Sequence, residues 1–254
     1  MALFAGERAL VTGAASSIGR GIALALAREG AHVLLADINL VGVAETCRQI
    51  REKGGSAQAI ESDLSLPDGH RTLLAACAKD LPLHMFVHAA SPARREKDGV
   101  RTVSEDTWDA MVTTNTRAGF FLGREIALGM VKGKIPGRLL YLTSLHAESP
   151  RNLAHYSASK GGMRMVMMEL ARAFGPDGVR VNALAPGAVP GGGAASMSGA
   201  MAEKIPLGRT GTPDDMARTA LAILSNEMMP YVTGATIPVD GGMQLFNWID
   251  FEGV

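Results

Sequence analysis

Residues 12–21 read Thr12-Gly13-Ala14-Ala15-Ser16-Ser17-Ile18-Gly19-Arg20-Gly21, between a short apolar run and a segment with helical spacing. Small residues at a turn from a strand into a helix let backbone N–H groups approach a pyrophosphate closely. The amino terminus of the helix adds positive partial charge at the same place. The stretch therefore predicts a dinucleotide-binding turn, with its phosphate contacts at Gly13, Ser16, Ser17, Ile18 and Gly19.

Asp37 extends this prediction to the adenosine ribose. It ends the second predicted strand, about 20 residues after the glycine turn, where a carboxylate can bind the ribose hydroxyls. A carboxylate repels a 2′-phosphate, and no Arg or Lys follows Asp37 to offset the repulsion. We therefore expect NAD rather than NADP as the cofactor.

The rest of the chain alternates short apolar runs with longer segments of helical spacing. The predicted strands are Arg8–Val11, His32–Ala36, Met85–His88, Leu139–Leu142, Arg180–Ala183 and Thr236–Val239. The predicted helices are Arg20–Glu29, Val41–Lys53, Gly69–Lys79, Thr107–Met130, Ala158–Phe174 and Pro213–Ser225. Such alternation predicts parallel pairing through βαβ crossovers. Residues 1–254 contain no repeat or linker, so we expect a single α/β domain: a Rossmann-type, doubly wound parallel sheet with helices on both faces.

Composition argues against several kinds of partner. Lys plus Arg and Asp plus Glu each number 25, so the formal net charge is zero. Binding to nucleic acid or to a membrane surface needs a basic face, and neither partner is expected. The basic stretch Arg94–Lys97 is interrupted by an acid and is interpreted as a solvated loop. No apolar run of about 18 residues and no secretory leader pattern occur, and Cys47 and Cys77 are isolated, so we expect a cytoplasmic protein.

Tyr156 and Lys160 stand four residues apart in Tyr156-Ser157-Ala158-Ser159-Lys160, at the head of a predicted helix. This spacing places both side chains on one helix face. A phenol with an ordinary pKa of about 10 is a poor base near neutrality, and a neighbouring ammonium favours its phenolate. Tyr156 would then take a proton from an alcohol or return one to a ketone. Ser144, at a strand end, would hydrogen-bond the substrate oxygen, and Asn115 would carry a water between Lys160 and solvent.

Taken together, these stretches resemble the short-chain dehydrogenase/reductase family over essentially the whole chain. The matching stretches are residues 12–21, Asp37, Asp63-Leu64, Asn115, Ser144, Tyr156–Lys160, Arg180–Gly187, Ile205–Arg209, Tyr231–Gly234 and Val239–Gly242. The resemblance implies hydride transfer between a nicotinamide and a secondary alcohol or ketone, with the catalytic set Ser144, Tyr156, Lys160 and Asn115. It also implies cofactor contacts from Asp63 and Leu64 at the adenine, Ala89 and Ala90 at the ribose, Tyr156 and Lys160, and Pro186, Gly187 and Val189 at the nicotinamide.

The chain departs from the family pattern in three places. The family usually has Gly at the position of Ser17, so the backbone approach to the pyrophosphate is expected to be looser. It usually has Asn-Asn-Ala-Gly where this chain has His88-Ala89-Ala90-Ser91, so backbone groups are expected to make the ribose contact. Pro190 and three glycines stand where a Thr commonly holds the carboxamide. None of these changes removes a catalytic group.

Three further segments carry expectations about closure and assembly. Gly187–Met201 is rich in Gly, Ala and Ser and has no charge, which suits a substrate loop at about 187–204 that closes over the pocket. The cluster Met163, Met165, Met167 and Met168 suits a core or a subunit interface. Since the corresponding helix of the family commonly packs against its symmetry mate, the resemblance implies a homodimer or homotetramer. Phe246, Trp248, Ile249 and Phe251 are expected either to dock on a neighbouring subunit or to fray.

The substrate is expected to be a small molecule. The stretch Ser144-Leu145-His146-Ala147-Glu148 resembles that of some sugar 1-dehydrogenases, and NAD suits oxidation. A sugar or polyol is therefore the first expectation, with Ser144, His146, Glu148 and Tyr156 at the substrate. The alternatives are a reductase of 3-oxoacyl thioesters and a nucleotide-sensing protein without turnover. No metal site is expected, because His88, His146 and His155 lack a carboxylate or cysteine at ligand spacing.

Overall fold

The computed structural model describes residues 2–94, 98–190 and 199–245. Its centre is a parallel sheet of seven strands in the order β3-β2-β1-β4-β5-β6-β7. The strands are β1 Arg8–Thr12, β2 His32–Asp37, β3 Ser56–Glu61, β4 Met85–His88, β5 Arg138–Leu142, β6 Arg180–Pro186 and β7 Thr236–Val239. The direction of winding reverses between β1 and β4, as in a doubly wound sheet. The predicted fold class is confirmed.

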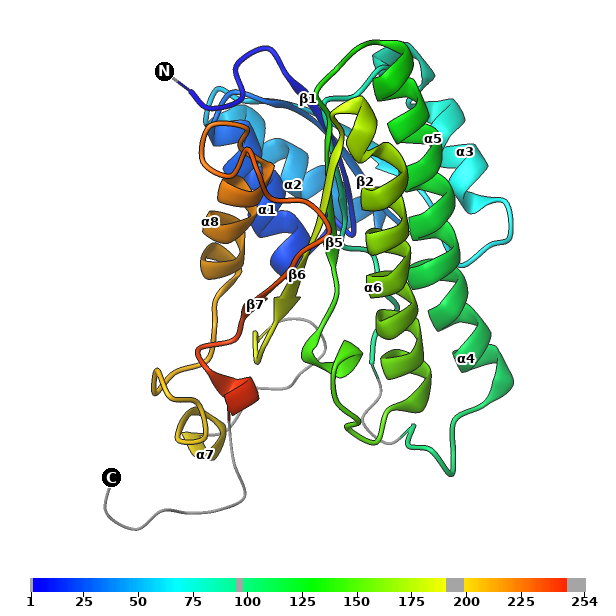
Figure 1. Ribbon diagram of the computed structural model, residues 1–254, viewed down its shortest axis with the longest axis vertical. Coiled ribbons are helices and arrows are strands. Elements are labelled where there is room, and N and C mark those ends of the chain that lie inside the picture. Colours follow the sequence, from blue (N-terminus) through cyan, green and yellow to red (C-terminus); the bar gives the residue numbers. More distant parts are fainter. Residues whose placement is uncertain (1, 95–97, 191–198, 246–254) are drawn as a thin grey trace.

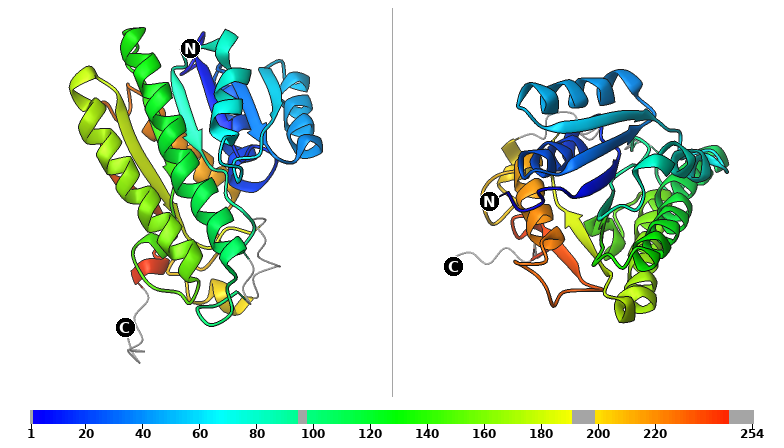
Figure 2. Two further views of the ribbon diagram at one scale, coloured as in Figure 1. Left: turned by 90° about the vertical axis from the view of Figure 1, so that its right-hand side faces the viewer. Right: turned by 90° about the horizontal axis from the view of Figure 1, so that it is seen from above.

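Helices cover both faces of the sheet (Figures 1 and 2). One face carries α1 Ser17–Arg28, α2 Leu40–Glu52 and α8 Pro213–Leu224. The other carries α3 Gly69–Ala76, α4 Glu105–Val112, α5 Ala118–Lys132 and α6 Ala154–Phe174. The strands divide their side chains between these layers: Ala9 and Val11 of β1 enter one apolar core, and Leu10 enters the other. A sheet buried on both faces accounts for the continuous apolar runs in the sequence.

The strand β3 was not among the predicted strands. It reads Ser-Ala-Gln-Ala-Ile-Glu and lies at the edge of the sheet, where only Ala57 and Ile60 are buried. With one β-branched residue and no regular alternation, it gives little strand signal in the sequence. Its hydrogen-bonded register with β2, from Ser56 opposite His32 to Glu61 opposite Asp37, supplies the pairing that the sequence did not reveal.

The prediction of one continuous helix over Thr107–Met130 is wrong, because this segment is interrupted. The chain forms α4, then a π-helical turn at Thr113–Arg117, then α5. The backbone hydrogen bonds of a π turn span one residue more than those of an α-helix, and such turns are common at functional sites. The helix α6 also begins at Ala154, earlier than the predicted Ala158, so that Tyr156 lies in its first turn. The shorter elements are α7 Gly199–Ala202 and the 3₁₀ turns Ala78–Asp80, Leu145–Ala147, Gly175–Asp177 and Met243–Leu245.

Two predicted features lie wholly or partly outside the described residues. The substrate loop at 187–204 is described only at 187–190 and from 199 onward, and the apolar C-terminal residues Phe246, Trp248, Ile249 and Phe251 fall beyond residue 245. Within the described part of the chain, no helix is both long and apolar enough to cross a bilayer.

Candidate active site

The main cleft of the molecule has a volume of about 1060 Å³ and lies at the carboxyl ends of the strands, across the point where the winding reverses. Ligands of doubly wound sheets bind at this place because loops from adjacent strands diverge there. Most of the predicted site residues line it: Gly13, Ser16, Ser17, Ile18, Gly19, Asp37, Asp63, Leu64, Ala89, Ala90, Ser144, His146, Tyr156, Lys160, Pro186, Gly187 and Val189. Asn115 and Glu148 do not line it.

The turn between β1 and α1 packs closely on itself and on the segment after β4, which glycine makes possible. Gly13 has a φ of 70°, and a Cβ there would lie 2.7 Å from the backbone of Ala89 and Ala90. A Cβ at Gly19 would lie 2.0 Å from the carbonyl oxygen of Gly13. Ser16 caps α1 without a side-chain hydrogen bond, so the first N–H groups of the helix suit an anion. The turn therefore fits the pyrophosphate of a dinucleotide.

Ser17 adopts the left-handed conformation that the family's usual glycine would adopt more easily. Its φ is 46°, and a non-glycine residue in this region carries strain of about 1–2 kcal/mol. Glycine would adopt this backbone conformation at a lower cost in free energy.

Asp37 is held in place at the adenosine end of the cleft. Its Oδ2 accepts a hydrogen bond from the N–H of Ala15 at 3.0 Å, and its Oδ1 accepts one from the N–H of Asn39 at 2.9 Å. Arg20, the nearby basic residue of the turn, donates to the carbonyl oxygens of Ala15 and Gly42 and does not line the cleft. This end of the described lining therefore presents the carboxylates of Asp37 and Asp63 without a basic side chain beside them.

Tyr156 and Lys160 lie together at the other end of the cleft. The Lys160 Nζ lies 5.6 Å from the centre of the Tyr156 ring and donates to the carbonyl oxygen of Leu142 at 2.7 Å. Burial, and next the charge of Arg94, lowers the pKa of Lys160 to about 7. A phenolate at Tyr156 and an ammonium at Lys160 would stabilise each other in this desolvated place. The pair is arranged for proton exchange near neutral pH.

Ser144 follows β5 and faces the same part of the cleft. Its Oγ accepts a hydrogen bond from the N–H of His146 at 3.3 Å. This bond uses a lone pair of the oxygen and not its proton, so the hydroxyl can donate to a substrate oxygen. The short 3₁₀ turn at Leu145–Ala147 keeps the side chain at the strand end.

Asn115 lies behind the cleft, in the π-helical turn. Its Nδ2 donates to the Ser159 Oγ at 2.8 Å, and that hydroxyl donates to the carbonyl oxygen of Tyr156 at 2.8 Å. Among the described residues, no group donates to its buried Oδ1. The extra residue of the π turn thus fastens Asn115 to the first turns of α6, next to the tyrosine.

His88 connects the cofactor turn to Asn115, a role that sequence reasoning missed. Its Nε2 lies 3.1 Å from the carbonyl oxygens of both Thr114 and Asn115, which only accept, so Nε2 carries the proton. Its Nδ1 then accepts from the Thr12 hydroxyl at 3.0 Å. That hydroxyl oxygen in turn accepts from the N–H groups of Ala89 and Ala90. Burial, together with Lys160 nearby, lowers the pKa of His88 to about 4 and keeps the ring neutral.

Two arginines at the substrate end also escaped the sequence analysis. Arg94, interpreted as part of a solvated loop, is half-buried, and its guanidinium lies 5.2 Å from the centre of the Tyr156 ring. Arg151 lines the same part of the cleft. Only their positions directly after β4 and before α6 would have pointed to them. Glu148, in contrast, pairs with Arg164 at 2.9 Å.

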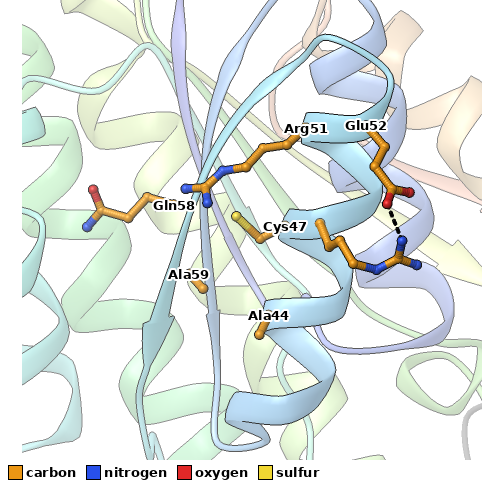
Figure 3. Close-up of a pocket in the computed structure, with 7 residues that line it drawn as sticks. Ala44, Cys47, Arg51, Glu52, Gln58 and Ala59 are labelled. Atoms are coloured by element: carbon orange, nitrogen blue, oxygen red, sulfur yellow. Dashed lines mark hydrogen bonds and ion pairs between the residues drawn. The ribbon is translucent and has the colours of Figure 1, made fainter.

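A second hollow lies against the edge of the sheet, between α2 and β3 (Figure 3). The Arg51 guanidinium and the Cys47 thiol of α2 both donate to the carbonyl oxygen of Ala57, and these bonds fasten the edge strand to its helix. Arg48 pairs with Glu45 and Glu52 within α2. Elsewhere, the described residues contain no group of three His, Cys, Asp or Glu side chains that could hold a metal ion.

Comparisons with known proteins agree with this site. A family model described as enoyl-(acyl carrier protein) reductase matches residues 13–244. The chain is 33% identical to glucose 1-dehydrogenase 2 of Bacillus subtilis, over 95% of this chain and 96% of that protein. It is 31% identical to 2-dehydro-3-deoxy-D-gluconate 5-dehydrogenase of Pseudoalteromonas atlantica, over 93% and 95% of the two chains.

A solved structure from Beutenbergia cavernae, provisionally described as an NAD(P)-dependent gluconate 5-dehydrogenase with NADP bound at low occupancy, superposes with a TM-score of 0.89. It is 34% identical to this chain, and the match covers 96% of this chain and 100% of that one. The fold, the cleft and the relatives all lead to one conclusion: the chain belongs to the short-chain dehydrogenase/reductase family.

Proposed function

We propose that this protein oxidises a secondary alcohol of a sugar or polyol, or reduces the corresponding ketone, with NAD as the hydride acceptor. The observation that carries the proposal is the arrangement of the main cleft. Ser144, Tyr156 and Lys160 lie together at one end of it, and Asp37 lies at the other. An extended dinucleotide bound along the glycine turn would join these two ends.

The roles of the residues follow from their chemistry. The nicotinamide, when bound, accepts or returns a hydride at the reacting carbon. Tyr156 removes the proton of the alcohol as the carbonyl forms. Lys160 lies above the Tyr156 ring, favours its phenolate and returns the proton toward solvent, with a water held by Asn115 as the link. Ser144 donates a hydrogen bond to the substrate oxygen and keeps it at the tyrosine.

The choice of NAD rests on charge. The carboxylates of Asp37 and Asp63 line the adenosine end of the cleft, and no basic side chain of the described lining stands beside them to bind a 2′-phosphate. The Beutenbergia cavernae structure holds NADP, which indicates that this related protein can bind the phosphorylated cofactor. The electrostatics of this chain's own residues favour NAD.

The choice of a sugar or polyol rests on the relatives and on the stretch around Ser144. One matched relative acts on glucose and another on a deoxygluconate, by their names. The runner-up substrate is a 3-oxoacyl thioester, and the description of the matching family model favours it. The complete set of Ser144, Tyr156, Lys160 and Asn115 argues against a nucleotide-sensing protein without turnover.

Steady-state assays test the proposal. The purified protein would be supplied with NAD and, separately, with NADP, against a panel of sugars, polyols, sugar acids and hydroxyacyl thioesters. We expect the formation of reduced cofactor with NAD and a sugar-type substrate. Turnover with hydroxyacyl thioesters alone would select the runner-up, and a preference for NADP would contradict the role given to Asp37.

A further inference from the structure

Ser159 lies on the first turns of α6, one residue before Lys160, and does not line the main cleft. Its side chain is buried, and its hydroxyl oxygen lies 2.8 Å from the carbonyl oxygen of Tyr156 and 2.8 Å from the Nδ2 of Asn115. The carbonyl oxygen of Ser159 accepts a third hydrogen bond, from the Thr116 hydroxyl at 2.9 Å. Ser159 therefore joins α6 to the π turn that carries Asn115.

The single proton of the Ser159 hydroxyl determines which end of the Asn115 amide faces it. The carbonyl oxygen of Tyr156 can only accept, so the hydroxyl donates its proton there and must accept from Asn115. A side-chain amide has an oxygen at one end and N–H donors at the other, and its hydrogen-bond partners distinguish the two ends. The donor end, Nδ2, therefore faces Ser159. The same nitrogen lies 3.2 Å from the sulfur of Met111, which is also an acceptor.

The opposite end of the amide, Oδ1, is buried behind the cleft. In the part of the chain that the structure describes, no group donates a hydrogen bond to this oxygen. The backbone carbonyl oxygen of Asn115 already accepts from the Nε2 of His88. A buried acceptor without a partner is unfavourable, so Oδ1 is the atom of Asn115 to which the water of the proposed reaction would donate.

We propose that Ser159 is a positioning residue, which holds the Asn115 amide so that Oδ1, and not Nδ2, binds the water of the proton path. The inference rests on the proposed function and adds a residue to it. A water that donates one hydrogen to Oδ1 keeps a lone pair for the Lys160 ammonium. It takes the proton that this ammonium releases and gives its other hydrogen, as a proton, to the solvent. A reversed amide would donate to the water and compete with Lys160 for its lone pairs.

Neutron diffraction from crystals grown in D₂O tests the orientation directly, because deuterium on nitrogen distinguishes Nδ2 from Oδ1. We expect the deuterium atoms of the Asn115 amide on the side of Ser159 and Met111, and a water at hydrogen-bond distance from Oδ1. An amide oxygen that faces Ser159, or an Oδ1 without a water, would overturn the inference. The measurement uses the wild-type protein and needs no turnover.

Kinetics test what the orientation does. In Ser159→Ala the amide loses the acceptor that holds it, so we expect kcat to fall about 3- to 10-fold while KM for the alcohol stays unchanged. The solvent deuterium isotope effect on kcat should rise, because the release of the proton becomes slower. A lower kcat with an unchanged isotope effect would mean that the hydroxyl supports the helix and not the proton path, and would overturn the inference.

A double-mutant cycle shows whether Ser159 acts through Asn115. Asn115→Ala removes the amide, and in that background Ser159→Ala should have no further effect on kcat. Equal losses of kcat from Ser159→Ala in the two backgrounds would show that the two residues act independently, which contradicts a positioning role.

Ser225→Ala is the matched control. Ser225 is buried like Ser159, its hydroxyl oxygen accepts from the N–H groups of Glu227 and Met228, and it does not line the cleft. The substitution should lower the urea midpoint as Ser159→Ala does and leave kcat and the isotope effect at their wild-type values. The same kinetic changes in both variants would reflect a general loss of stability and overturn the inference. Turnover of no compound would contradict the proposed function, whereas the neutron map alone decides the orientation of the amide.

Discussion

We expect Asp37 to act on the cofactor through a single negative charge, which two backbone N–H groups hold in position. Replacing it with Ser removes the repulsion of a 2′-phosphate and a charged hydrogen bond to the ribose, which is worth about 1.5–3 kcal/mol. We expect the ratio of kcat/KM with NAD to kcat/KM with NADP to fall about 10- to 100-fold. Asp177→Asn is the control, because Asp177 is exposed and does not line the cleft, so it should leave the ratio unchanged. An unchanged ratio in Asp37→Ser would show that the carboxylate does not determine the preference for NAD over NADP.

His88 makes the free energy of unfolding depend on pH. The unfolded chain takes up a proton on this ring near pH 6.5, whereas the folded chain resists protonation down to about pH 4 because the ring is buried. The unfolded state therefore binds more protons in this window, and the free energy of unfolding falls as the pH drops from 6.5 to 4, by about 3 kcal/mol at most from this group.

The comparison with His88→Asn isolates that contribution. Asparagine keeps a donor and an acceptor but does not titrate, while the other groups, His146 among them, titrate in both proteins. Urea unfolding between pH 7 and 4 should show the wild type losing more stability than the variant. Parallel loss in both proteins would mean that His88 is already protonated in the folded state or that its ring is not buried.

The residues that line the main cleft were largely predictable from the sequence, and the residues that hold them in position were not. Gly13, Asp37, Ser144 and Tyr156 stand at strand ends or at a helix spacing that the chemistry demands. His88 stands at a strand end, and its partners at Nε2 are the backbone carbonyl oxygens of Thr114 and Asn115, which a π turn brings to it. Backbone acceptors carry no signal in a sequence.

At the level of elements, α5 packs directly on β5 at Gly119 and Gly123. A Cβ at Gly123 would lie 1.9 Å from the hydroxyl of Tyr141, a fully buried ring of β5 whose hydroxyl donates to the carbonyl oxygen of Gly119. Gly129, on the same helix, would meet nothing within 4 Å. The two glycines thus differ sharply in what a methyl group would meet.

We expect Gly123→Ala to lower the free energy of unfolding by about 1–3 kcal/mol, because the methyl group forces apart a packed interface. Gly129→Ala should raise it by about 0.5–1 kcal/mol, because alanine favours the helix and no contact opposes it. Urea unfolding of both variants measures the difference. A stabilising Gly123→Ala would mean that α5 does not pack on Tyr141 as described.

The elements that the sequence did not predict share a physical reason. Both β3 and the π turn depend on neighbouring elements. The strand β3 is defined by its pairing with β2. The π turn is held by hydrogen bonds from its Asn115 side chain to α6 and from His88 of β4 to its backbone carbonyls. Long apolar strands and amphipathic helices can be predicted from the pattern of apolar residues along the sequence. Elements that depend on tertiary contacts cannot.

At the scale of the molecule, apolar side chains remain exposed on the outer face of α5 and α6. Leu128, Met165 and Met168 are 48%, 52% and 37% exposed, whereas Met163 and Met167 of the same cluster are buried in the core. We expect the exposed residues to form a subunit interface of a homodimer or homotetramer. Met165→Glu should place a charge in that interface and lower the mass measured by light scattering, while Met228→Glu, at an exposed methionine that belongs to neither helix, should not. A wild-type protein that is monomeric at all concentrations would contradict the prediction.

The proposed reaction depends most on Tyr156 as the group that exchanges a proton with the substrate alcohol. The most direct test follows NADH formation by absorbance in the wild type, in Tyr156→Phe and in Tyr231→Phe, the last being a matched change at a fully exposed tyrosine. NADH binding, followed by fluorescence, serves as the measure of intact folding. We expect Tyr156→Phe to lose almost all turnover and still to bind NADH, and Tyr231→Phe to keep the turnover and the NADH binding of the wild type. Turnover at the wild-type rate in Tyr156→Phe would contradict the proposed reaction.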